Sequence, residues 1–266
     1  MIEIGRYTRD IPVSLERMFE NALDWEHLPH LHRTTLTDAS LRDRAGNFWE
    51  AKLRFTGMAA ASQTVRLTLD ESTGVWISEV IGGVSLGLAI HTTATAHGPE
   101  SLTVDVRFLV PGRRPWNRLL GRRLVAGYSQ LYDEDESMMI TRQARLNTQR
   151  GAGTHTASMP VALGSRSVVL EPGFTFNVGL RRFRVAEVIG SLVAFSVVCP
   201  HMLGPLEDSP VVEGTVTCPW HGYQFDITTR RGGDRRHQLR PAPHLRLDDH
   251  GVVWAESNDS DRNCPN

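Results

Sequence analysis

CPHMLG, residues 199–204, and CPWHGYQFD, residues 218–226, are the stretches that decide the fold of the second half of this chain. In each of them a cysteine is followed two or three residues later by a histidine, and sixteen residues separate His201 from Cys218. Proline and glycine favour short, fixed turns, so a thiolate and an imidazole from each loop can converge on one centre. The pattern predicts a [2Fe–2S] cluster in which two histidines replace two cysteines on one iron, a change that raises the reduction potential.

These motifs, and a Gly-Val-Val stretch ending in Trp254, resemble Rieske domains over roughly residues 161–256. The resemblance implies four cluster ligands, namely Cys199, His201, Cys218 and His221. A structural zinc ion bound by two cysteines and two histidines is the alternative for the same donors. Zinc sites usually open with Cys-x-x-Cys and not with Cys-x-His, which favours the cluster.

Cysteine usage and hydropathy indicate the compartment. The third cysteine, Cys264, lies in a polar tail, residues 258–266, and is interpreted as a bystander. Respiratory Rieske proteins carry a disulfide between the ligand loops and a membrane anchor, but Pro205 and Trp220 stand where those cysteines would be. No uncharged apolar run of membrane-spanning length occurs. We expect a cytoplasmic protein without a membrane contact, whose cluster has a potential toward the lower end of the Rieske range.

Length and composition are those of a globular protein of two domains. The chain has 266 residues, of which 40% are apolar and 22% are charged. Its formal net charge of −1 gives no reason to expect a nucleic acid as partner. A small, polar, glycine-rich segment predicts a linker. The predicted domains are residues 1–146, a linker 147–159, a second domain 160–257 and the tail.

The first domain reads as a mixture of helices and antiparallel strands. Ser14 is a suitable cap for an amphipathic helix, and a helical stretch free of internal proline covers about residues 116–146. Apolar and polar residues alternate over residues 50–55, 64–69 and 102–108. This order resembles the helix-grip fold of START-like (SRPBCC-like) domains, which also forms the catalytic domain of Rieske oxygenases. We therefore predict an α+β chain, with a helix-grip domain followed by an all-β Rieske domain.

The segment NALDWEHLPHLH, residues 21–32, holds three polar residues, Asn21, Asp24 and His27, along one stripe of the helix that begins near Ser14. On a regular helix His27 and His32 would point about 140° apart. Pro29 interrupts regular helix, which allows the two imidazoles to turn toward a common point. Taken alone, these histidines also fit ordinary surface positions beside a helix end.

The acidic run 133–136 supplies candidates for a carboxylate ligand, although such a run alone is typical of a solvated helix face. Within it, Asp135 has largely apolar residues three and four positions away, whereas Asp133 has polar ones, which predicts that Asp135 faces the core. A buried carboxylate is costly unless it is paired, and a metal would meet that requirement. The flanking residues are Leu131, Tyr132, Met138 and Met139.

The spacing Asn-x-x-Asp-x-x-His-x-x-x-x-His resembles the mononuclear-iron motif of Rieske oxygenases. The resemblance implies that Fe(II) is bound by His27, His32 and Asp135, with His30 as the histidine most easily mistaken for a ligand. Asp24 matches the family's bridging aspartate, which links an iron-bound histidine to a cluster histidine, here His221, of a neighbouring subunit in a homotrimer.

The resemblance implies an oxygenase that takes electrons from NAD(P)H through a separate ferredoxin or flavin reductase. It would insert oxygen from O₂ into a small apolar or aromatic organic substrate, by hydroxylation or demethylation. Family members place the Rieske domain first, whereas here the order is reversed. The alternatives are a non-catalytic Rieske electron carrier or redox sensor fused to a ligand-binding domain, and a zinc protein with a lipid-binding domain. Candidates for the wall of the pocket, which equally fit a plain core, are Phe55, Trp76, Leu86, Leu88, Phe108 and Tyr128.

Overall fold

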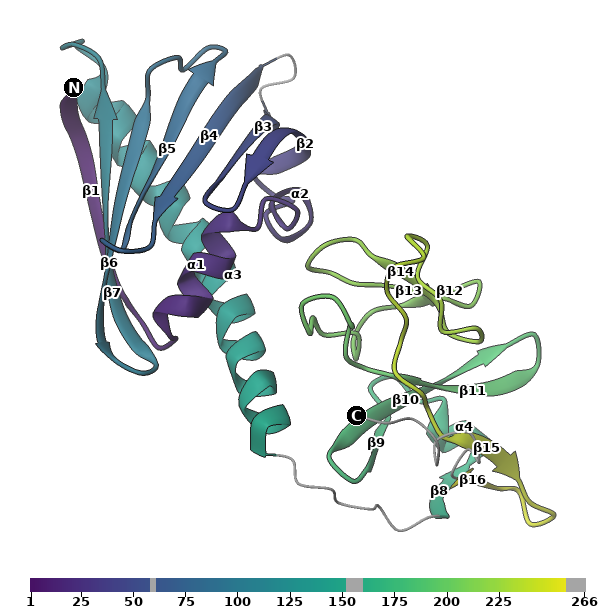
Figure 1. The fold of residues 1–266 in the computed structure, drawn as a ribbon. Coiled ribbons are helices and arrows are strands. Elements are labelled where there is room, and N and C mark those ends of the chain that lie inside the picture. Colours follow the sequence, from purple (N-terminus) through teal and green to yellow (C-terminus); the bar gives the residue numbers. More distant parts are fainter. Residues whose placement is uncertain (58–60, 152–159, 257–266) are drawn as a thin grey trace. The chain divides into compact units, whose positions relative to one another are not determined.

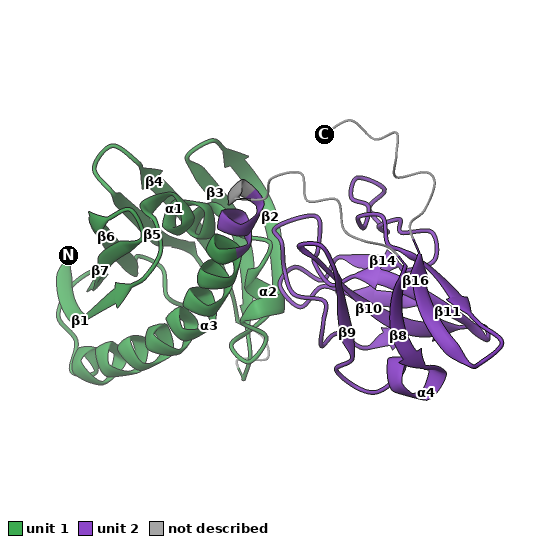
Figure 2. Cartoon of the chain, turned by 90° about the horizontal axis from the view of Figure 1, so that it is seen from below, with its two compact units in different colours: residues 1–144 green, residues 145–266 purple. Residues whose placement is uncertain are grey.

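The computed structural model describes residues 1–57, 61–151 and 160–256. The chain divides into two compact units, Met1–Ala144 and Arg145–Asn266, drawn in two colours in Figure 2. The predicted tail with Cys264 and residues 152–159 of the predicted linker lie outside the described residues.

The first unit is built on one antiparallel sheet of seven strands in the order β1-β7-β6-β5-β4-β3-β2 (Figure 1). Each consecutive pair from β2 to β7 is a hairpin. The first strand, β1, forms one edge of the sheet and pairs with the last strand, β7, for example Ile11 with Leu102. The strands are β1 (Ile2–Ile11), β2 (Leu36–Ala45), β3 (Phe48–Phe55), β4 (Ser62–Asp70), β5 (Val75–Gly82), β6 (Ala89–Gly98) and β7 (Ser101–Val110). The alternating stretches of the sequence correctly predict β3, β4 and β7.

Three helices belong to this part of the chain, namely α1 (Leu15–Leu23), α2 (Leu28–Leu31) and α3 (Asn117–Gly151). Ser14 caps α1 as predicted, because its hydroxyl accepts a hydrogen bond from the backbone N–H of Arg17 at 3.3 Å. In Figure 1, α1 and α3 lie on the same side of the sheet.

The core of the first unit lies between these helices and the sheet. Alternate residues of the strands point into it, since the side chains of a strand alternate between its two faces. Met18 of α1 and Tyr132 and Met139 of α3 complete the same apolar cluster. The Trp49 indole N–H donates to the backbone carbonyl of Ala22 at 2.9 Å and so ties β3 to the end of α1.

Two local predictions are wrong. The first helix ends at Leu23, so His27 lies outside it and Asn21, Asp24 and His27 do not share a helical stripe. Asp24 caps the helix in an extended conformation, and the chain turns before α2 begins. The second error concerns residues 147–151, assigned to the linker, which continue α3. The hydrogen bonds within α3 outweigh the weak helix preference of these polar residues.

The second unit begins with the last turns of α3, from Arg145, and its other described residues are β apart from the single turn of helix α4 (Arg166–Val169). It contains three small sheets with the strand orders β11-β10-β9, β12-β13-β14 and β15-β16-β8. The strands are β8 (Val161–Ser165), β9 (Thr175–Val178), β10 (Arg181–Val188), β11 (Ser191–Ser196), β12 (Val211–Val212), β13 (Thr215–Thr217), β14 (Gln224–Asp226), β15 (His244–Leu247) and β16 (Val252–Glu256).

The predicted α+β class is confirmed, with helices and one large sheet in the first unit and mainly strands in the second. Within the described residues, no helix is both long enough and apolar enough to cross a bilayer.

Candidate metal centres

The two Cys–His loops of the second unit follow strands β11 and β13 and are closed by their own backbone. In the first loop the Cys199 N–H donates to the Gly204 carbonyl at 2.9 Å. In the second, the Cys218 N–H donates to the Tyr223 carbonyl at 2.8 Å, and the Gly222 N–H donates back to the Cys218 carbonyl at 2.9 Å. Gly222 has a φ of +69°, which favours glycine and explains its place in the turn.

The four donors of these loops come together. The rings of His201 and His221 lie edge to face with 4.5 Å between their centroids, and the thiols of Cys199 and Cys218 are buried. The loops also press on each other, because a Cβ on Gly204 would lie 2.8 Å from the Sγ of Cys218. Glycine at this position therefore leaves the sulfur in place.

The thiols of Cys199 and Cys218 interact and shift each other's pKa in opposite directions. The contact with Cys199 lowers the pKa of the Cys218 thiol, although burial opposes its ionisation. The same contact, together with burial, raises the pKa of Cys199. One thiolate is thus favoured in the pair, and thiolates and imidazoles are the ligand types of a mixed [2Fe–2S] cluster. The residues present fit that group.

Three residues beside this site were not assigned from the sequence. The ring of Tyr223 lies 4.6 Å from that of His201, and the ring of His237 lies 5.1 Å from it, centroid to centroid. Asp234 fixes His237, since its Oδ2 lies 2.7 Å from the Nδ1 of the ring. In the sequence, Asp234 and His237 read only as part of an arginine-rich turn, so no local signal marks them.

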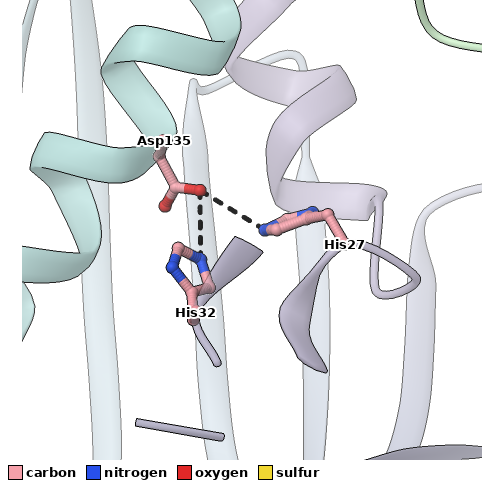
Figure 3. Close-up of side chains that lie close together, drawn as sticks. All are labelled: His27, His32 and Asp135. Atoms are coloured by element: carbon pink, nitrogen blue, oxygen red, sulfur yellow. Dashed lines mark ion pairs between the residues drawn. The ribbon is translucent and has the colours of Figure 1, made fainter. Parts of the chain in front are cut away.

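The first unit brings together His27 and His32, from the two ends of α2, with Asp135 from α3 (Figure 3). His27 immediately precedes α2, His32 immediately follows it, and Asp135 lies on α3. The single turn of helix places the two imidazoles 5.2 Å apart, centroid to centroid. Pro29 sits in the first turn of α2, where its missing N–H costs nothing, so it begins the helix and does not break one.

Both imidazole rings face the same carboxylate oxygen of Asp135. The Oδ1 of Asp135 lies 3.3 Å from the Nε2 of His27 and 3.2 Å from the Nε2 of His32. The Asn21 side-chain amide donates to the same oxygen at 3.2 Å. His27 and His32 are only 2% and 1% exposed, whereas the neighbouring His30 is exposed. The structure therefore separates the two buried histidines from the third without ambiguity.

The far nitrogen of each ring faces a second carboxylate. The Nδ1 of His27 lies 3.3 Å from the Oδ2 of Asp24, and the Nδ1 of His32 lies 2.6 Å from the Oε2 of Glu134. Carboxylates in this position orient an imidazole and increase its basicity toward a metal. Asp24 was assigned from the sequence, whereas Glu134 was not, because its partner depends on how α3 lies against α2.

The charges of the group agree with a cation site. Burial disfavours the charged form of His27, but its contacts with Asp135 and Asp24 raise the pKa of this imidazole to about 10. Burial likewise opposes ionisation of Asp135, yet the two histidines hold the pKa of its carboxyl well below the usual range. A proton on an imidazole is held here by carboxylates, and a metal ion could take its place. Two imidazoles and one carboxylate match the donor set of a mononuclear iron site with open positions.

A cavity of about 800 Å³ lies inside the first unit and is lined by Asp24, His27, His32 and Asp135. Most of its remaining wall is apolar or aromatic and comes from the sheet and α3, with Trp49, Trp76 and Tyr128 among the lining residues. Its volume falls in the range of small-molecule sites. Of the apolar residues that the sequence suggested for a pocket, Phe108 is the exception, because it lies buried in the core outside this lining.

Comparisons with known proteins recognise the second unit. Residues 162–243 match the family described as the Rieske [2Fe-2S] domain. A search of curated proteins finds no match to this chain. The match supports an iron–sulfur electron-transfer role for this part of the chain.

Similar solved structures cover one unit or the other. The protein TTHA0849 from Thermus thermophilus is 17% identical, with a TM-score of 0.44, over 51% of this chain and 96% of its own. The ferredoxin of carbazole 1,9a-dioxygenase from Nocardioides aromaticivorans IC177 is 24% identical, with a TM-score of 0.33, over 38% of this chain and 100% of its own. The quaternary ammonium Rieske monooxygenase CntA is 9% identical, with a TM-score of 0.41, over 55% of this chain and 39% of its own.

Proposed function

We propose that this chain is a Rieske-type non-haem iron oxygenase with its domains in reversed order. The first unit would be a helix-grip domain of START type that binds Fe(II) and an apolar or aromatic organic substrate. The observation that carries the proposal is the convergence of His27, His32 and Asp135 on the wall of an apolar cavity, in a chain that also holds a Rieske domain. The reaction would be a hydroxylation or a demethylation with O₂.

The residues of the first unit have distinct roles in this proposal. His27, His32 and Asp135 would hold Fe(II), which supplies open positions for O₂ beside the substrate. Asn21 holds the ligating carboxylate in place by its hydrogen bond, and Glu134 orients the His32 ring. The apolar wall of the cavity binds the substrate and excludes water from it.

The electrons would come from NAD(P)H through a ferredoxin or a flavin reductase. A basic loop beside His201 suits an acidic donor of this kind, and complementary charge speeds the encounter of redox partners. Its four exposed arginines take part in no ion pair with another described residue. They are Arg231, Arg235, Arg236 and Arg240.

Electron transfer to the mononuclear site would take place within a homotrimer. In this arrangement Asp24 would link His27 to His221 of the partner subunit, as the bridging aspartate does in the family. Its contact with the Nδ1 of His27 supports one half of that link. Reversal of the domain order need not change either domain's fold, because domains fold on their own cores.

Iron counting tests the proposal against a plain electron carrier. Anaerobically purified protein should hold about three irons and two acid-labile sulfides per chain, whereas a carrier should hold only the irons of its cluster. His27→Ala should lose about one iron and keep the Rieske absorption and EPR spectrum, because only one of the two sites loses a ligand. His30→Ala, which changes the exposed neighbour, is the matched control and should keep all the iron. Full iron in His27→Ala would refute the site.

A further inference from the structure

The cavity of the first unit runs along one side of α3. The helix residues that line it recur every three or four positions, which keeps them on one face. They run from Asn117, the first residue of the helix, through Arg123 to Asp135 of the metal centre. Arg123 and Asp135 are twelve positions apart in the sequence, which corresponds to about 18 Å along the helix axis. The cavity is therefore long, with the metal centre toward one end.

The opposite end lies where the β5–β6 loop meets the segment before α3. A Cβ on Gly87 would lie 3.0 Å from the Cγ of Pro111, so the two segments are in close contact. Three apolar side chains that line the cavity here are largely exposed, namely Val84 (72%), Leu86 (63%) and Trp116 (54%). Exposed apolar residues that continue the wall of a cavity mark the place where a ligand enters or covers them.

Two arginines line the half of the cavity that is nearer the start of α3. Arg114 and Arg123 both line it, and neither forms an ion pair with another residue in the described part of the chain. The guanidinium of Arg114 packs over the ring of Trp116, 5.6 Å from its centroid. An arginine presents a fixed fork of donors that matches a carboxylate. The entrance thus combines apolar contact with groups that bind an acid.

We propose that the ligand of this cavity is an elongated amphiphilic acid. Its apolar body, about 15 to 18 Å long, would lie along α3, with its carboxylate at Arg114 and Arg123. Its far end would reach the side chains of His27, His32 and Asp135. The inference rests on the proposed function only for that last contact, because the acid preference follows from the entrance alone.

Two pairs of probes test the acid preference. Tetradecanoate and deoxycholate represent a chain and a fused ring system, and the methyl ester of each has the same body without the charge. Calorimetric titration of the full-length protein should show at least one acid binding about tenfold more tightly than its ester, the size of effect expected for charge-assisted hydrogen bonds.

Substitutions of the two arginines test whether they cause the preference for the acid over its ester. Arg114→Gln combined with Arg123→Gln should bring the acid within about twofold of the ester, while ester binding stays unchanged. Arg122→Gln, which removes a neighbouring charge that does not line the cavity, is the matched control and should keep the preference. Equal binding of acid and ester by the unmodified protein would overturn the inference. A preference that survives the double substitution would do the same.

The iron count tests the proposed oxygenase site, and the binding measurement tests the preference for an acid, so either proposal can be refuted without the other. If His27→Ala keeps its iron, the proposed oxygenase site falls, but a preference for the acid would still stand on the titrations. If the preference is absent while the third iron is present, only the choice of substrate class falls.

Discussion

At the scale of the residue, the oxygen Oδ1 of Asp135 is the centre of the candidate metal site in the first unit. It accepts a hydrogen bond from Asn21 and faces the Nε2 atoms of His27 and His32. Both rings are backed on their other side by carboxylates, so neither can rotate without losing a charged partner. The ligand atoms are thus held in place by the protein itself, which lowers the cost of arranging them around a metal.

Asp24→Asn separates metal binding from electron transfer. Asparagine keeps the shape of the side chain but removes its charge, so His27 loses the charged partner of its Nδ1. We expect both metal centres to remain under saturating iron and transfer from the cluster to slow by about 10- to 100-fold, the usual effect of losing such a carboxylate. Single-turnover kinetics with a pre-reduced cluster measure this rate. An unchanged rate in an iron-replete variant would remove the bridging role.

At the scale of the element, α3 connects the parts of the first unit. It supplies Asp135 and Glu134 to the candidate metal centre and forms one wall of the cavity. It also packs directly on β1. The closest contact is at Gly121, where a Cβ would lie 1.8 Å from the carbonyl oxygen of Ile4. The backbones of helix and strand therefore touch, and any larger residue must push them apart.

Gly121→Ala should destabilise the first unit although alanine is the better helix former. We expect a loss of about 1–3 kcal/mol from overpacking, which exceeds the gain of about 0.5–1 kcal/mol from replacing a helical glycine. Gly127→Ala on the same helix meets nothing within 4 Å and is the matched control, with a small gain in stability. Urea unfolding followed by circular dichroism measures both. Stabilisation of both variants alike would show that the contact with Ile4 relaxes freely.

At the scale of the whole molecule, one chain joins an electron-transfer unit to a unit with a ligand cavity. The Rieske domain presents exposed arginines beside the histidines of its cluster loops. A second set, Arg113, Arg114, Arg118, Arg122 and Arg123, lies at the start of α3. Either set could attract an acidic protein. The first set belongs to the same unit as the residues that would hold the cluster and lies beside His201.

Charge reversal distinguishes the two basic surfaces. Arg235→Glu combined with Arg236→Glu should slow reduction of the cluster by an acidic ferredoxin about tenfold at low ionic strength, because it removes electrostatic attraction. The effect should shrink as salt screens the charges. Arg118→Glu combined with Arg122→Glu is the control of equal charge change and should leave the rate unchanged. Stopped-flow reduction measures all three proteins. A slower rate only in the helix variant would move the docking surface to α3.

The sequence by itself was sufficient for whatever depends on neighbours along the chain. Cys199 and His201 share one short loop, and Cys218 and His221 share another, so local turns bring each pair together. The motif can therefore be recognised from the sequence without knowledge of the fold. The inward position of Asp135, whose side chain is only 13% exposed, was also predictable, since its helical neighbours at three and four positions are apolar. The strands with clear alternation, such as β3 and β7, follow from the same kind of local pattern.

Only the tertiary structure decided which groups meet across the fold. β2 is almost wholly exposed at the edge of the sheet and carries little alternation, so nothing local marks it. The pairing of Glu134 with His32, and the approach of His237 to His201, join residues whose neighbourhood depends on how elements pack. The break after Leu23 likewise replaces the predicted helical stripe. Hydrogen bonds within a turn are set by adjacent residues, whereas contacts between distant segments form only when the core is buried. The first kind of contact could therefore be predicted from the sequence, and the second could not.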